Sequence, residues 1–418
     1  MKNIRKIKFL SFVIAFLPIL NIYETGIVPL LAIGQLLFVV FIVFDLLQRQ
    51  SIHIKFIGFL FYAVFISILN WTRPSVIFLQ SFSETLSLIL FVVLLSYSVE
   101  RGNEIYVKKY LFVLAKYSLI FFYFQYALSL VGIHVIGIIP GVPLANGADP
   151  SSFYNSHLLL TRLSSFFQEP AHYAEFMSLI LAFILFKEQN KRKNLFLSIL
   201  ISMSIVLSQS AGGYFLLLTC WLYWTYTHLR SSKGKSVFLI VLPILVVAVI
   251  YGSQTEMVSK VLGRYASLSF TPENSEYGYS SYVRLFRGYI PIFESPWYSQ
   301  LFGNGLGTLL SFVKSNPGSA YLSITDYDPN WINSFQYIIF CTGAVGFLIF
   351  FKKLLQMFRR TSQFGKCLFF IYLLDLLSAG MLMTASSILF LFFMFKEYYK
   401  YNKYNKYNKY DINYCSHL

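Results

Sequence analysis

Residues 366–395 read KCLFFIYLLDLLSAGMLMTASSILFLFFMF, and the topology of the whole chain depends on how this run is divided. A helix needs roughly 17–25 apolar residues to cross about 30 Å of hydrocarbon. The run is too long for one ordinary span and short for two. Because Ser378-Ala379-Gly380 lies near its middle, we predict a tight hairpin of two short helices.

Ten further apolar runs precede this hairpin. Together they predict an all-α, polytopic integral membrane protein with about 12 transmembrane helices (roughly 10 to 12). The composition agrees, because 56% of the 418 residues are hydrophobic and 12% are charged, which is half the charged fraction of soluble domains. The ten runs lie near residues 7–23, 27–47, 54–71, 74–98, 108–133, 171–187, 194–209, 212–229, 236–252 and 332–351.

Basic residues gather on one side of this predicted topology. If the N-terminus is inside and the spans alternate, 26 of the 34 basic residues fall inside and one, Lys116, lies within a span. Cytoplasmic loops carry an excess of Lys and Arg, so we expect both termini in the cytoplasm. The same bias explains the net charge of +16 without nucleic acid as a partner. The seven outside residues are Arg73, Arg162, Lys260, Arg264, Arg284, Arg287 and Lys314.

The chain is expected to form one membrane domain, residues 1–418, with three segments beyond the spans. Residues 134–170 are an outside loop, residues 253–331 are a large outside loop between spans 9 and 10, and residues 396–418 are a low-complexity cytoplasmic tail. The large loop holds 15 aromatic residues with scattered Arg, Glu and Asp. Such a mixture suits a site that stacks on sugars and holds phosphate. The alternative is a folded cap that buries its own aromatic residues.

Glu169-Pro170 has the pattern of a helix start, because proline in the first turn loses no needed hydrogen bond. Glu169, His172 and Glu175 follow at three-residue spacing and therefore share one helix face. A carboxylate and an imidazole at the outer edge of the membrane could move a proton. A capped helix with a polar first turn explains the same residues without chemistry.

Arg284 and Arg287 lie one helical turn apart in the large loop. Two such arginines can hold a phosphate or diphosphate through paired hydrogen bonds, although a solvated helix face would also place them so. The glycines from Gly303 to Gly307 follow, but no strand precedes them and no βαβ unit surrounds them, so a dinucleotide fingerprint is excluded. Asp326 and Asp328 flank one residue and are a weak candidate for a divalent cation.

Two charged residues are expected within spans, Glu84 and Lys116. Counted along their helices, both lie at a similar depth of the membrane. Because unpaired charges are costly there, we predict that the two pair. The alternative is that each faces another polar group.

The order of these motifs resembles the O-antigen polymerase and O-antigen ligase superfamily, which includes capsule and exopolysaccharide polymerases. The resemblance covers roughly residues 160–350. It rests on an R-x-S-S-x-F-x-E-P-x-x-Y-A stretch from Arg162 to Ala174, a Ser-Gln-Ser-Ala-Gly-Gly turn from Ser208, an Arg before a Phe-Gly-x-Gly-x-Gly run, and Asn333-Ser334-Phe335 at the start of a span ending Thr342-Gly343-Ala344-Val345-Gly346.

The resemblance implies polymerisation of lipid-linked oligosaccharide repeat units into O-antigen, capsule or exopolysaccharide on the outer face of the bacterial cytoplasmic (inner) membrane. Donor and acceptor would be carried on undecaprenyl diphosphate, with a chain-length regulator as a candidate partner and no cofactor. The functional arginines of the family correspond to Arg162 and Arg284. Glu169 and His172 are the candidates for proton transfer, and Arg287, Asn333 and Arg264 are the candidates for substrate binding.

Two other functions remain open. Ligases of the superfamily carry a His just before the Asn of the last motif, where this chain has Ile332. That departure weighs against a ligase and leaves the base unidentified. A flippase or transporter of lipid-linked sugars would share the basic, many-span composition, but transporters often contain internal repeats, and transport does not explain the large loop.

Overall fold

The computed structural model describes residues 2–24, 32–139, 141–145, 163–188, 191–229, 283–322, 332–378, 380 and 382–415. Helices dominate these ranges. The extended pairing within them is limited to two isolated bridges, which join Tyr23 to Leu144 and Glu24 to Ala32. The predicted all-α class is therefore confirmed for the described part of the chain.

The described helices follow the apolar runs of the sequence. In the first half they are α1 (Lys2–Leu20), α2 (Ile33–Leu47), α3 (Ile57–Asn70), α4 (Phe78–Arg101), α5 (Glu104–Ser129), α6 (Pro170–Lys187), α7 (Lys191–Leu207) and α8 (Ala211–Leu229). The predicted run 236–252 lies outside the described residues. Within the predicted large loop, residues 283–322 form the five-residue π-helix η3 (Val283–Arg287) and the short helices α12 (Tyr289–Glu294), α13 (Trp297–Phe302) and α14 (Leu309–Ser315).

The last part of the chain contains α15 (Ser334–Arg359), α16 (Gln363–Ser378) and α17 (Ala385–Cys415). Residues 366–395 thus divide between two helices that pack against each other, with the break near Gly380. The predicted hairpin is present. Its second helix is longer than expected, because α17 continues through the Lys-Tyr-Asn repeats to Cys415.

Among the described residues, α4, α5, α6 and α15 are long and apolar enough to cross a membrane. Helices α2, α3 and the last part of α7 are apolar but shorter. The chain is therefore a membrane-embedded helical protein, while the count of 12 spans and the place of the large loop among them stay predictions.

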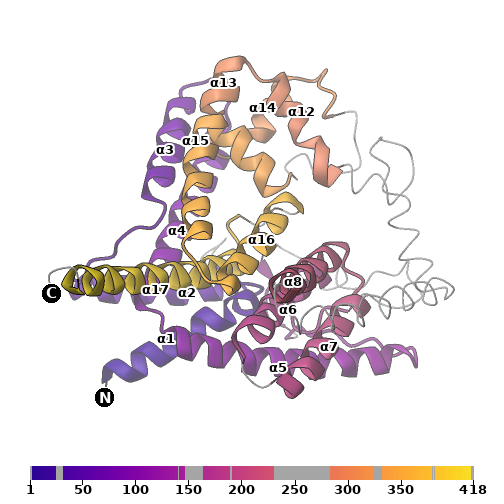
Figure 1. The fold of residues 1–418 in the computed structure, drawn as a ribbon. Helices are drawn as coiled ribbons and strands as arrows, with labels where there is room; N and C mark the ends of the chain where they lie inside the picture. The colour runs from indigo at the N-terminus through magenta and orange to yellow at the C-terminus, as the bar shows by residue number, and fades with distance from the viewer. Residues whose placement is uncertain are drawn as a thin grey trace.

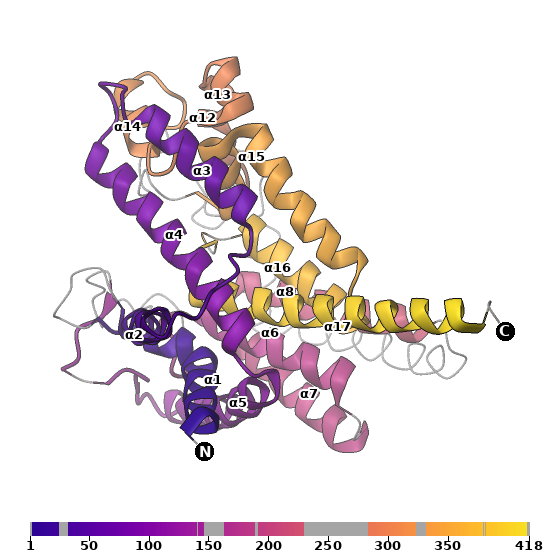
Figure 2. The ribbon, with the colours of Figure 1, turned by 90° about the vertical axis from the view of Figure 1, so that its left-hand side faces the viewer.

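Two groups of helices meet in the molecule. α3, α4 and α15 lie side by side, and α12–α14 cover one end of them (Figures 1 and 2). α6, α7, α8 and α16 form the second group, and α17 packs against α4, α16 and α1. One apolar core runs through both groups. α16 therefore has neighbours on both sides of the fold.

Every ion pair between described residues lies at helix ends that the charge bias assigns to the cytoplasm. Asp45 at the end of α2 pairs with Lys6 and lies 3.8 Å from the Arg101 Nε. Glu397 of α17 accepts from Lys187 at 2.7 Å, and Lys400 joins it to Glu104. These contacts gather the ends of α1, α2, α4, α5, α6 and α17 as the alternating topology requires.

The predicted pairing of Glu84 with Lys116 is wrong. The Glu84 carboxylate instead accepts a hydrogen bond from the Tyr337 hydroxyl at 3.3 Å. Lys116 lies on an exposed face of α5, which packs against α1, α6 and α7. Equal depth along two helices does not make those helices neighbours.

Candidate functional site

Helix α6 begins at Pro170, as its sequence predicts. Glu169 is the N-cap residue with extended backbone (φ −135°, ψ 155°), but its side chain makes no capping hydrogen bond. The side chain is exposed. The carboxylate therefore does not cap the N-terminus of α6. The interpretation of Glu169 as a simple helix cap does not explain why an acid occurs here.

The three polar residues of the first turns of α6 become more buried along the helix. Glu169 is exposed, His172 is half-buried and Glu175 is only 3% exposed. Tyr173 fixes the same turn from another side, because its hydroxyl donates to Ser204 at 2.8 Å and its ring stacks on Phe122 with centroids 4.8 Å apart. A polar face thus leads from the start of α6 into the core.

Glu175 meets a second carboxylate at the end of this face. Asp375 of α16 is also 3% exposed, and the two carboxyl groups lie near enough to interact electrostatically. Glu175 additionally interacts with Ser386 of α17. The core beneath the start of α6 therefore contains two acids from different helices.

The arginine segment, which is η3 with Arg284 and Arg287, forms the other side of the site. Arg284 belongs to η3, whose backbone is described while the Arg284 side chain lies outside the described residues. The Arg287 side chain is fully buried, and its guanidinium carbon lies 4.0 Å from the centre of the Tyr321 ring. In this structure Arg287 packs η3 against the segment after α14. Direct contact of Arg287 with a substrate therefore stays a prediction.

The first turn of α15 holds η3 in place. Gln336 donates from Nε2 to the Leu285 carbonyl at 2.8 Å, and Gly288 lies so close that a Cβ there would be 2.3 Å from the Gln336 Oε1. Asn333 caps α15 by accepting from the Gln336 N–H at 2.8 Å and is 2% exposed. The side chain of Asn333 is thus occupied in starting the helix, and a role in substrate binding stays a prediction.

α16 joins the two sides. It contacts η3, and it also packs along α6 and α8. The turn after it is bound to α15, because Leu382 N donates to the Ser334 Oγ at 2.7 Å. The candidate site is therefore the junction of η3 with the first turns of α6 and α15 and the last turns of α16.

The glycine run after α13 allows this loop to pack closely against α15. Gly303 and Gly305 have positive φ (100° and 88°), and a Cβ on Gly303 would be 2.3 Å from the Cys341 carbonyl oxygen. The N–H groups of Asn304 and Gly305 donate to the Phe340 and Cys341 carbonyls at 3.0 and 2.9 Å. Close approach to α15 explains why glycines occur here, in agreement with the exclusion of a nucleotide fingerprint.

Four predicted residues cannot be placed in this site. Arg162, Arg264, Asp326 and Asp328 all lie outside the described residues. Within the described ranges, no group of three or more His, Cys, Asp or Glu side chains is positioned to hold a metal ion.

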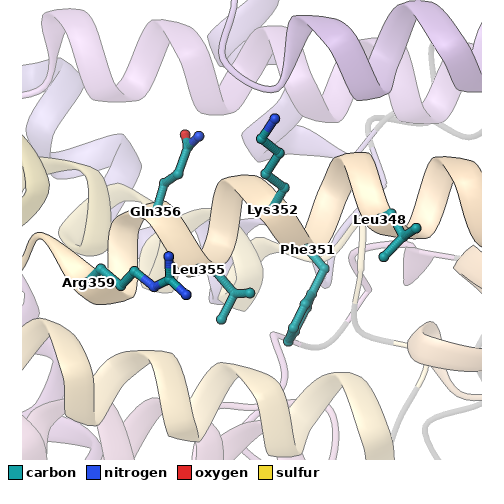
Figure 3. A pocket seen from close by; sticks show the side chains of 6 residues that line it. All are labelled: Leu348, Phe351, Lys352, Leu355, Gln356 and Arg359. Atoms are coloured by element: carbon teal, nitrogen blue, oxygen red, sulfur yellow. The ribbon is translucent and has the colours of Figure 1, made fainter.

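A shallow pocket lies elsewhere, on the opposite half of α15. One helix supplies its whole lining, and Figure 3 shows Lys352, Gln356 and Arg359 beside apolar side chains. It is remote in sequence from the first turn of α15, which carries the site contacts. We therefore assign the candidate site to the helix junction and not to this pocket.

A family model described as WcaD colanic acid polymerase matches residues 145–398, which is more than half of the chain. The chain belongs to this polymerase family. The match includes α6, η3, α15 and α16, and so contains the whole junction described above. Neither the curated proteins nor the solved structures contain a significant match.

Membership of the WcaD family establishes the function class. The protein polymerises saccharide repeat units into exopolysaccharide and is a glycosyltransferase-type polymerase that acts on lipid-linked oligosaccharides. The family match favours neither the ligase nor the flippase alternative. It also narrows the broader superfamily resemblance to one of its polymerase branches.

Sequence reasoning missed Asp375 as part of the polymerase junction. Asp375 is the only acidic residue in the run 366–395, and an acid inside a membrane span is by default a functional candidate. That signal was present in the sequence. What the sequence could not supply was its neighbour Glu175, which is 200 residues away along the chain.

Proposed function

We propose that this polymerase transfers the growing glycan from undecaprenyl diphosphate to the sugar end of a new lipid-linked repeat unit. The observation that carries the proposal is the contact of α16 with both η3 and α6. One helix thereby joins the Arg284 segment to the turn that contains Glu169 and His172. A diphosphate and an acceptor hydroxyl could reach one junction from opposite sides.

In this proposal Arg162 and Arg284 bind the diphosphate. Negative charge develops on that group as the sugar bond breaks, and positioned arginines stabilise it without a metal. A guanidinium contributes two parallel hydrogen bonds to phosphate oxygens, which an ammonium group cannot reproduce. Arg287, buried against Tyr321, holds in place the backbone of η3, to which Arg284 belongs.

The acceptor hydroxyl needs a base within hydrogen-bond reach. Glu169 and His172 are our candidates, because both lie on the outer turn of α6 and the Glu169 carboxylate makes no capping bond. Replacement by Gln removes basicity and keeps a similar size. Normal polymer from both Glu169→Gln and His172→Gln would place the base elsewhere.

We further propose that the reaction occurs on the outer face of the bacterial inner membrane, with both termini in the cytoplasm. Support comes from the bias of Lys and Arg and from the ion pairs that gather the same helix ends. A reporter fused after Lys396 should respond as cytoplasmic, and one inserted within 265–325 as external. An external tail would contradict this orientation.

The arginines provide the decisive experiment. Arg162→Lys and Arg284→Lys, produced at wild-type levels in a deletion strain, should each lower the polymerisation rate by ~10²–10³, the loss typical of one transition-state donor. Single repeat units should still accumulate. The matched control is Arg73→Lys, a half-buried arginine whose guanidinium lies 5.9 Å from the Tyr298 ring. Full-length polymer from both variants would refute the diphosphate assignment.

A further inference from the structure

Glu175 and Asp375 form a carboxylate pair that the reaction as described so far does not use. The residues come from α6 and α16, and each is 3% exposed. One oxygen of each group, the Glu175 Oε2 and the Asp375 Oδ2, is buried without a hydrogen-bond partner. Two unpartnered carboxylate oxygens in an apolar core require an explanation, because buried polar atoms are ordinarily bonded.

Within the described residues, no cation balances the charges of the pair. Neither carboxylate belongs to an ion pair within the described part of the chain. Burying one unpaired carboxylate is costly, and two like charges at close range add repulsion. Burial therefore favours a state in which at least one of the two acids is neutral.

Side chains from four helices interact with the pair. Cys220 of α8 and Tyr372 of α16 interact with Asp375. Ser386 of α17 and the Glu169 carboxylate of α6 interact with Glu175. Glu169 is exposed, so Glu175 and Asp375 remain the buried acids among these groups.

The pair is connected to the outer surface by the polar face of α6. Glu175 lies about five residues, or ~8 Å at 1.5 Å per residue, from the start of α6. His172 is one turn nearer the surface and Glu169 one turn beyond that, with exposure rising in that order. Asp375 is three residues from the end of α16 at Ser378. Both acids thus lie close beneath the candidate site.

We propose that Glu175 and Asp375 share one proton at rest and take up the second from the acceptor hydroxyl by way of His172. This inference rests on the proposed glycan transfer. The hydroxyl oxygen bonds to the anomeric carbon while the bond from that carbon to the diphosphate oxygen breaks, and the diphosphate leaves with the electron pair. The hydroxyl proton passes to one imidazole nitrogen, and the other nitrogen releases a proton to the singly charged pair. Glu169 returns that proton to water.

The first test needs no turnover. Infrared spectra of the purified full-length protein in lipid membranes at neutral pH should contain a carboxylic-acid C=O band that Glu175→Gln/Asp375→Asn lacks. The double variant should keep the wild-type unfolding midpoint or exceed it, because amides are cheaper to bury than charges. An identical carboxylic-acid band in wild type and double variant would overturn the shared proton.

The second test measures polymerisation of lipid-linked repeat units by the same preparations. Glu175→Gln and Asp375→Asn should each lower the rate at least tenfold, towards the ~10²–10⁴ that acid–base groups contribute. Glu188→Gln is the matched control, since it removes a carboxylate that pairs with Lys108 at the opposite end of α6, and it should leave the rate unchanged. Wild-type rates in both pair variants would overturn the relay.

Arg284→Lys, measured in parallel, separates the two proposals. An inactive Arg284→Lys beside fully active pair variants would reject the relay alone. A fully active Arg284→Lys would reject the diphosphate assignment, and the infrared comparison would still decide whether the pair holds a proton.

Discussion

The Gln336 side chain donates a hydrogen bond from Nε2 to the backbone carbonyl of Leu285, the residue after Arg284, at 2.8 Å. Gln336 is fully buried, and its own N–H is held by Asn333. The bond joins the first turn of α15 to η3. It makes the position of the arginine segment dependent on the Asn-Ser-Phe motif, although the two are about 50 residues apart in the chain.

Replacing Gln336 by Glu should displace the arginine segment. The carboxylate cannot donate to the Leu285 carbonyl, and an unsatisfied buried acceptor costs about 1–3 kcal/mol. We expect polymerisation to fall roughly tenfold, because 1.4 kcal/mol corresponds to a factor of ten. The measurement is the polymer ladder at equal protein level. Gln356→Glu makes the same change at an exposed position of α15, and equal ladders from the two variants would contradict this role.

The stacking of Arg287 on Tyr321 should stabilise the outer segment. Tyr321→Leu removes the ring and should lower the unfolding free energy by about 1–2 kcal/mol through the lost cation–π contact alone. Tyr321→Phe keeps the ring and should lose much less. Thermal unfolding of the purified protein in detergent compares the two. Similar midpoints for Leu and Phe would show that the ring face does not matter.

Glu397 should make stability depend on pH. Burial by itself raises the pKa of the Glu397 carboxyl, but hydrogen bonds from Lys187 and Ser362 outweigh it and hold the pKa below its usual range. A lowered carboxyl pKa contributes stability above the unfolded value of about 4.3, and this contribution is lost as the pH falls through the lowered pKa. The free energy of unfolding of the wild type should therefore exceed that of Glu397→Gln at pH 7 by about 1.5–3 kcal/mol. This difference in unfolding free energy should disappear in acid.

Glu188→Gln is the control for this measurement. Glu188 pairs with Lys108 at 2.6 Å, but both side chains are about one-third exposed. Exposed pairs contribute about 0–1 kcal/mol. A difference between wild type and Glu397→Gln that stays constant from pH 7 into acid would refute the assigned charge state of Glu397.

Gly343 should tolerate no side chain. Its backbone (φ 63°, ψ −175°) interrupts α15, and a Cβ there would lie 2.4 Å from the Leu301 carbonyl oxygen. Backbone conformations that are essentially confined to glycine cost other residues about 1–3 kcal/mol before any clash. Gly343→Ala should lower both folded yield and unfolding midpoint. Gly318→Ala, where a Cβ meets nothing within 4 Å, should change neither.

Local signals predicted much of this structure. Pro170 marks the start of α6, Asn333 caps α15, and the Ser378-Ala379-Gly380 turn separates α16 from α17. Each of these features depends on neighbours within a few residues. The sequence therefore contains what is needed to place them.

Contacts between distant helices were not predictable in the same way. Hydropathy gives the depth of Glu84 and Lys116 but not which helices pack together, so their predicted pairing failed. The Glu175–Asp375 pair was missed for the same reason, although each acid stands out in its own apolar run. The sequence suggested that a span ends at the motif Thr342-Gly343-Ala344-Val345-Gly346. In the structure α15 instead kinks at Gly343, and the loop after α13 packs against this kink.

Different kinds of interaction hold the helices together at the two ends of the assembly. At the ends assigned to the cytoplasm the described contacts include ion pairs such as Lys187–Glu397 and Lys400–Glu104. At the opposite ends no ion pair joins the described residues, and the contacts include neutral bonds such as those from Asn304 and Gly305 to α15. Dissolved salt screens the attraction between exposed charges over a length that shortens from about 10 Å at 0.1 M to about 3 Å at 1 M, and it leaves neutral hydrogen bonds nearly unchanged. Ionic strength near 1 M should therefore loosen the molecule first at the helix ends that carry the ion pairs, while the opposite ends keep their shape.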